Sequence, residues 1–129
     1  MRIKLLPRIA LLSLLLLFPL DIGAACFTVE ATAGRVVDGD TFLTEVEIWP
    51  GLKADERIRV LGVDTPEMKG TTKPAAVEAQ KFTQAWLAKG PFTIKTCGRD
   101  SFGRLLGTVI RGDENLASAL IGAGMGVKR

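Results

Sequence analysis

The chain has 129 residues, with 17 lysines and arginines, 14 aspartates and glutamates, and no histidine. This length is enough for one domain with a buried core of its own. Because histidine is absent, any general base or metal ligand in this chain must be an oxygen group or a cysteine.

The N-terminus has the layout of a secretory signal peptide. Three basic residues precede a 12-residue apolar run at positions 9–20, and small residues follow at positions 23–25. An apolar run of this length is short for a membrane span. We therefore predict a signal peptide over residues 1–25 and one domain over residues 26–129, in a secreted or periplasmic protein. An uncleaved N-terminal anchor is the less favoured alternative.

The basic character of the whole chain belongs largely to this leader. Without residues 1–25 the counts become 14 basic against 13 acidic residues, a net charge of +1. A polyanion would have to be held by local positive charge and not by the field of the whole domain.

The two cysteines are Cys26 and Cys97. An even number of cysteines in an exported protein favours a disulfide. Alternatively, Cys26 would be the first mature residue and would carry a lipid, because residues 23–26 partly match a bacterial lipoprotein signal. One thiol cannot do both, and we favour the disulfide. Attachment to a membrane is expected only if Cys26 is lipidated.

Residues 26–63 show strand patterns. Residues 26–38 are rich in threonine and valine, and residues 42–49 alternate between polar and apolar side chains, as half-buried strands do. A Pro-Gly turn at 50–53 leads into residues 56–63. There Arg57 and Arg59 share one face of the strand, opposite Ile58 and Val60.

From Pro74 to Lys89 the period changes to that of a helix. Its apolar positions recur at three- and four-residue spacing: Ala75, Ala79, Phe82 and Trp86. Residues 92–97 and 103–110 return to strand character, and residues 115–122 predict a second, short helix. Five strands and two helices in about a hundred residues suggest a small barrel, or a curved sheet with a helix at one end.

Two acidic segments are candidates for metal chemistry. Asp38 and Asp40 lie two residues apart, so an extended backbone directs both carboxylates to one face. A hard cation such as calcium prefers such oxygen ligands, although an Asp-Gly turn explains the same residues without a metal. Asp64 and Glu67 leave the end of a strand together. Between them Pro66 holds the preceding residue extended and leaves its carbonyl potentially free as a ligand.

Two arginines accompany these acids. Arg59 lies on a strand that is otherwise apolar, and Arg104 opens a strand after Gly103. A guanidinium group matches the geometry of phosphate. A surface ion pair is the alternative for Arg59, and a structural role at the start of a strand is the alternative for Arg104.

In this order the three segments resemble the staphylococcal nuclease family, or thermonucleases. The segments are Asp38-Gly39-Asp40-Thr41, then Arg59 with Val63-Asp64-Thr65-Pro66-Glu67, then Asp100-Ser101-Phe102-Gly103-Arg104. The resemblance runs from about Arg35 to Gly126. It implies a mainly β fold, namely a five-stranded OB-fold barrel with two packed helices, and calcium-dependent cleavage of DNA and RNA.

The resemblance also implies roles for individual residues. Asp40 and Asp64 would bind calcium through their carboxylates and Thr65 through its carbonyl, with Asp38 just outside this shell. Glu67 would be the general base or would orient the attacking water. Two arginines, Arg59 and Arg104, would bind the phosphate and stabilise its transition-state charge.

The same barrel would place Cys26, at the start of the first strand, beside Cys97, at the end of the fourth, and so implies a bridge. The chain also departs from the well-known member of the family. It has no tyrosine, and Phe102 takes the place of one that lies near the phosphate. The loop at 68–73 is shorter, and the chain stops at Arg129, where longer relatives add a helix.

We expect a monomer that needs no protein partner and acts on DNA and RNA. The alternative is an OB-fold module that binds single strands or peptides without cutting them.

Overall fold

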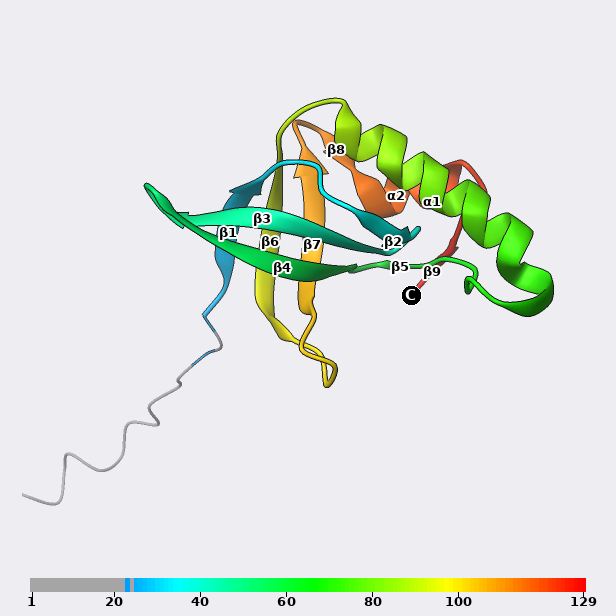
Figure 1. Ribbon diagram of the computed structural model, residues 1–129, viewed down its shortest axis with the longest axis horizontal. Helices are drawn as coiled ribbons and strands as arrows, with labels where there is room; N and C mark the ends of the chain where they lie inside the picture. The colour runs from blue at the N-terminus through cyan, green and yellow to red at the C-terminus, as the bar shows by residue number, and fades with distance from the viewer. Residues whose placement is uncertain (1–22, 24) are drawn as a thin grey trace, which may run out of the picture.

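The computed structural model describes Gly23 and residues 25–129, in which a closed β-barrel is covered at one end by helices (Figure 1). Apart from Gly23 and Ala25, the predicted signal peptide lies outside the described residues. The strands are β1 (Phe27–Ala31), β2 (Val36–Asp38), β3 (Thr41–Trp49), β4 (Leu52–Val60), β5 (Val63–Asp64), β6 (Phe92–Arg99), β7 (Leu105–Arg111), β8 (Glu114–Asn115) and β9 (Val127–Lys128). The helices are η2 (Gly70–Thr72), α1 (Lys73–Ala88) and α2 (Leu116–Gly122).

Five long strands close the barrel. Antiparallel pairs join β1 to β6, β6 to β7, and β3 to β4, while β7 and β4 run parallel. A short antiparallel pairing of β1 with β3 completes the ring. The five-stranded OB-fold barrel is therefore confirmed, with β2 and β8 as short additions to β3 and β7.

The first predicted strand is divided in two. Residues 26–38 form β1 and β2, because the chain turns away at 32–35 to cross β3. At this crossing the Leu43 amide donates to the Arg35 carbonyl at 2.7 Å. A Cβ atom at Gly34 would collide with the Leu43 carbonyl oxygen. This close approach lets one segment pair first with β6 and then with the other end of β3.

Helix α1 has the predicted position but a slightly different buried face. Ala75 is exposed and Ala76 is buried in its place, so the prediction for Ala75 was wrong by one residue. Phe82 is half-buried and packs against the core, as predicted. The buried side chains are Ala76, Ala79, Thr83, Trp86 and Leu87. This stripe lets the helix seal the barrel end next to β2 and α2 (Figure 1).

Aromatic and branched side chains fill the barrel. Phe92 makes an edge-to-face contact with Phe42 at a centroid distance of 5.8 Å, and lies 6.4 Å from Trp86 of α1. Ile58, Ile94 and other aliphatic residues surround these rings. The core thus joins both strands of the β3–β4 hairpin to the helix that covers the barrel.

The disulfide between Cys26 and Cys97 is present, with their Cα atoms 4.1 Å apart. It links the residue before β1 to β6, as the pairing of those strands requires. A thioether-linked lipid on Cys26 is incompatible with this bridge. Neither α-helix of the described part of the chain has the length and apolar character needed to cross a bilayer.

Candidate active site

The segments singled out in the sequence meet around one hollow of about 560 Å³ beside the α1 end of the barrel. Pro66 and Arg129 contribute to its lining. The predicted catalytic and metal-binding residues that line it are Asp38, Asp40, Arg59, Asp64, Thr65, Glu67 and Arg104. Phe102 does not line this hollow but faces the neighbouring ones.

Strand pairing explains this convergence. Thr41 pairs with Arg59 across β3 and β4, so the acidic turn before β3 lies beside the end of β4. The Val60 amide donates to the Asp40 carbonyl at 2.8 Å. After a turn at Gly62 the chain forms β5, which carries Asp64 back to the same end of the barrel.

Contacts with helix α1 hold the acidic turn at residues 38–40 in place. The buried Thr83 hydroxyl donates to the Gly39 carbonyl at 2.6 Å. A Cβ atom at Gly39 would lie 2.7 Å from Cγ2 of Thr65 and 2.8 Å from Cβ of Ala79. Gly39 does not have a positive φ, so the requirement for glycine here comes from lack of space for a Cβ atom and not from the backbone conformation.

The carboxylate of Asp40 is buried and fully engaged. One oxygen accepts from the Thr65 amide at 2.9 Å and lies 3.4 Å from Nη1 of Arg59, and the other accepts from the Thr41 hydroxyl at 3.1 Å. Burial alone would raise the pKa of Asp40, but its hydrogen bonds with Asp38 and Thr65 and the charge of Arg59 together lower it.

Asp38 has the opposite shift. Burial, and then the hydrogen bond with and negative charge of Asp40, raise its pKa to about 6. Its carboxylate accepts from the Asp40 amide at 3.2 Å. The pair therefore concentrates negative charge on one side of the hollow, which favours a cation nearby.

Arg59 lies at the bottom of the hollow and is only 7% exposed, so the alternative of a surface ion pair was wrong for this residue. Its Nη1 donates to the carbonyls of Val60 and Val63 at 2.7 and 2.9 Å. Its Nη2 donates to the Asp64 carboxylate. Arg59 therefore connects the two proposed calcium ligands and sets their separation.

Arg104 forms the opposite wall. Its Nε donates to the Asp100 carboxylate at 2.7 Å, and its Nη1 lies 3.4 Å from the Thr41 hydroxyl. The other Asp100 oxygen accepts from the amides of Phe102 and Arg104 at 2.9 and 3.0 Å. The sequence reasoning quoted Asp100 but gave it no role. Its spacing of four residues before an arginine, across a glycine turn, was the available signal.

Glu67 lies at the exposed rim. Its side chain is 71% exposed and pairs with the Lys69 ammonium at 2.9 Å. Its carbonyl accepts from the Thr72 hydroxyl at 2.7 Å, which ties the segment to the start of α1. The carboxylate is therefore accessible to water, as a general base must be.

The ligand types in the hollow fit a hard cation. Asp40, Asp64 and the main chain of Thr65 offer oxygen atoms, which calcium prefers. Within the described residues, the Thr65 hydroxyl is the buried side-chain polar atom that has no hydrogen-bond partner, which suits a further ligand beside it. Among the described residues, no group of three or more acidic, histidine or cysteine side chains is placed so that it could hold a metal ion. A cation there would have to share the carboxylate oxygens with Arg59.

Comparison with known proteins gives two matches. The sequence model of the family described as "Staphylococcal nuclease homologue" matches residues 57–129. A thermonuclease from Staphylococcus intermedius is 36% identical over 85 residues, which cover 62% of this chain and 48% of that protein. The chain thus spans about half the length of this curated relative. The family match includes Arg59, Asp64 and Arg104, and begins after the Asp38–Asp40 turn.

Proposed function

Because this chain belongs to the staphylococcal nuclease homologue family, we propose that it is a calcium-dependent phosphodiesterase that hydrolyses DNA and RNA. The observation that carries the proposal is the single hollow in which Glu67, Arg104 and the Asp40–Asp64 pair face one another. Metal-assisted attack of water on a phosphate needs a base, a cation site and hydrogen-bond donors around one phosphorus atom.

The metal ligands and the base would have separate roles. Asp40, Asp64 and the Thr65 carbonyl would hold calcium, which supplies positive charge next to the phosphate. Glu67 would take a proton from the attacking water or orient that water. Both assignments suit a carboxylate that is largely exposed and lines the hollow.

The two arginines would differ in their contributions. Arg104 keeps Nη2 free of any protein partner in the described residues, and its Nη1 contact with Thr41 is long. It would donate to the non-bridging phosphate oxygens and stabilise the charge that grows there. Arg59 already donates to two carbonyls and Asp64. It would therefore mainly hold the acidic ligands in place and meet the phosphate with its remaining donors.

The experiment is hydrolysis of single-stranded DNA and of RNA by the oxidised protein, with calcium and with a chelator. We expect cleavage with calcium, none with chelator, and loss of cleavage in Asp40→Asn. Asp113→Asn is the matched control, because Asp113 lies in an exposed turn and should leave cleavage intact. Calcium-independent binding without any cleavage would instead support a non-catalytic OB-fold module.

We further propose that the protein is exported as a monomer, with residues 1–25 removed. The apolar run at 9–20 supports this, as does the Cys26–Cys97 bridge, since disulfides persist in oxidising compartments. The intact mass of secreted material would report the loss of the leader and the two hydrogens missing from the bridge. An acyl group on Cys26 would contradict the proposal and favour a lipid anchor.

A further inference from the structure

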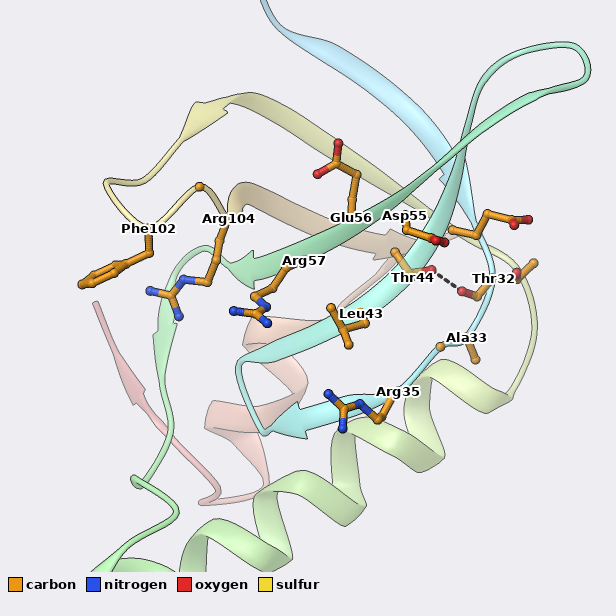
Figure 2. Close-up of a pocket in the computed structure, with 13 residues that line it drawn as sticks. Thr32, Ala33, Arg35, Leu43, Thr44, Asp55, Glu56, Arg57, Phe102 and Arg104 are labelled. Carbon is orange, nitrogen blue, oxygen red and sulfur yellow. Dashed lines mark hydrogen bonds between the residues drawn. The ribbon is translucent and has the colours of Figure 1, made fainter.

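A second hollow, of about 710 Å³, lies on the outer face of β3 and β4 next to the candidate active site. Resting on the proposed function, we propose that its arginine side is a binding track for the single strand of nucleic acid that continues beyond the cleaved phosphate. The track consists of Phe102, Arg104, Arg57 and Arg35. Figure 2 shows the three guanidinium groups facing this hollow in the order Arg104, Arg57, Arg35, with Phe102 beyond Arg104.

Arg104 joins the two hollows, because it lines both of them. A strand whose phosphate is held by Arg104 in the active site would therefore pass directly over Arg57 and Arg35. Both of these residues are exposed. Each comes from a different segment, Arg57 from β4 and Arg35 from the crossing before β2.

The charges in the second hollow are unevenly paired. Arg35 and Arg57 are exposed and, within the described residues, their guanidinium groups have no hydrogen bond or ion pair to the protein. Two of the acids at the other side are already neutralised. Glu56 accepts two hydrogen bonds from Arg99, at 2.7 and 2.8 Å, and Glu45 pairs with Lys53 at 2.8 Å.

Asp55 is the unpaired acid of this hollow, and Figure 2 places it away from Arg104, on the side of Thr32 and Thr44. The free positive charge is thus concentrated on the side that adjoins the active site. Two unpaired guanidinium groups in a row suit a chain of phosphates better than an isolated anion. The track also explains how a domain with a net charge of only +1 after removal of its leader would hold a polyanion.

Phe102 adds a contact that phosphate alone would not need. Phe102 is 81% exposed, and its ring centroid lies 5.5 Å from the Arg104 guanidinium carbon. An exposed aromatic side chain beside a line of cations is the usual means of holding unpaired bases, because every base can stack on it. A duplex hides its base faces, so this combination favours a single strand.

The test is binding of a labelled oligothymidylate of about 16 nucleotides, the upper site size of one OB-fold, in chelator so that cleavage cannot occur. For single strands the logarithm of affinity falls with the logarithm of salt by about 0.7 per phosphate contact. Arg35→Gln/Arg57→Gln should lower that slope by about 1.4. The variant should therefore bind roughly 25-fold more weakly than wild type at 0.1 M salt, when the two affinities are equal at 1 M.

Matched variants identify the cause of any loss. Lys89→Gln/Lys95→Gln removes two exposed charges that do not line either hollow, and should leave affinity within about twofold of wild type. Arg35→Lys/Arg57→Lys keeps the charge and should retain most of the binding and the salt slope. The proposed track would be wrong if Lys89→Gln/Lys95→Gln lost as much affinity as Arg35→Gln/Arg57→Gln. It would also be wrong if Arg35→Gln/Arg57→Gln bound the oligonucleotide as tightly as wild type. Equally good displacement by polyglutamate or by a duplex would contradict it as well.

The two proposals fail in different ways. If wild-type protein binds the oligonucleotide through Arg35 and Arg57 but never cleaves it with calcium, the nuclease proposal is wrong and the track stands. If it cleaves, and the Arg35→Gln/Arg57→Gln variant has normal affinity and normal KM for long strands, the track is wrong and the nuclease proposal stands. A thymidine dinucleotide, too short to reach Arg35, should be cleaved equally by both proteins.

Discussion

The two hollows that meet at Arg104 differ in whether their charged side chains are already paired within the protein. In the candidate active site, Arg59 pairs with both Asp40 and Asp64, and main-chain hydrogen bonds fix Arg59 and Asp40. In the second hollow, the guanidinium groups of Arg35 and Arg57 have no partner within the described residues. The first hollow is arranged before any ligand arrives, whereas the second has cations that only a ligand would satisfy.

This difference predicts that the two hollows contribute to different steps, one to turnover and the other to binding. Groups held by several hydrogen bonds keep their geometry and suit a reaction that depends on sub-ångström positions. Exposed arginines have flexible side chains, so they lose little binding free energy when a bound nucleic-acid strand shifts its position. They therefore suit binding that does not depend on the base sequence or on the register of the strand. Variants in the first hollow should therefore change turnover, and variants in the second should change affinity for long strands.

Glu67→Gln should cause the largest loss. It removes the proposed base, and turnover should fall by roughly 100- to 10,000-fold, while affinity for the oligothymidylate stays unchanged. The side chain is exposed and pairs only with Lys69, so the free energy of unfolding should change by less than about 0.5 kcal/mol. Single-turnover kinetics and chemical denaturation measure both quantities.

Glu78→Gln is the matched control, because Glu78 is an equally exposed glutamate paired with a neighbouring lysine on α1. It should leave turnover and stability unaltered. If Glu67→Gln unfolds the protein, or if Glu78→Gln lowers turnover by as much, the lower turnover of Glu67→Gln is not evidence that Glu67 is the general base.

Arg104→Lys tests the residue shared by the two hollows. The charge remains but the planar fork is lost, so turnover should fall by about 100-fold or more, and affinity should fall by a smaller factor. Arg99→Lys is the control for the turn of the same β6–β7 hairpin, since Arg99 pairs with Glu56 and donates to the Gly103 carbonyl at 2.9 Å but does not line the active site. Near-normal turnover in Arg104→Lys would make this arginine structural.

Much of the fold could be predicted from the sequence. Alternation over 42–49 and helical spacing after Pro74 are local signals, and both elements formed where expected. The break at 32–35 was missed because it arises from contact with β3, at Gly34 and Leu43. A contact between segments has no signature in the local pattern of either one.

The candidate site shows the same limit. That Asp40, Arg59 and Asp64 share a hollow follows from pairing of β3 with β4, and the motifs indicated it. The burial of Arg59, the unpaired Thr65 hydroxyl and the track at Arg35 and Arg57 did not follow from any motif. Each depends on which partners reach a side chain in three dimensions, and sequence spacing alone does not give that.

Gly39→Ala tests whether the packing behind the active site sets its geometry. The added Cβ would press on Thr65 and Ala79, and crowding of this kind costs about 1–3 kcal/mol of stability. Turnover should fall as well, since Thr65 carries a proposed ligand. Gly98→Ala is the control, because a Cβ there meets nothing within 4 Å. Thermal unfolding of both variants would show whether the two glycines differ as expected.

Asp100→Asn should have the smallest effect and is the most specific test of how Arg104 is positioned. Burial alone would raise the pKa of Asp100, but its hydrogen bonds with Arg104 and Phe102 together lower it. The ion pair is therefore present at neutral pH and is lost only as the pH falls through a value below 3.8. The oxygen of an asparagine side chain can still accept from the Phe102 and Arg104 amides. Its NH2 group, which is a donor, would then face Nε of Arg104, so the charge-assisted hydrogen bond there is lost.

We expect turnover to fall roughly tenfold in Asp100→Asn, with little change in KM for the thymidine dinucleotide. If Asp100 acts through Arg104, the same substitution should cost almost nothing in the Arg104→Lys background, because the fork that it orients is already gone. Additive losses in the double variant would mean that Asp100 supports the turn and not the guanidinium. That result would leave the contact with Thr41 as what holds Arg104 toward the active site.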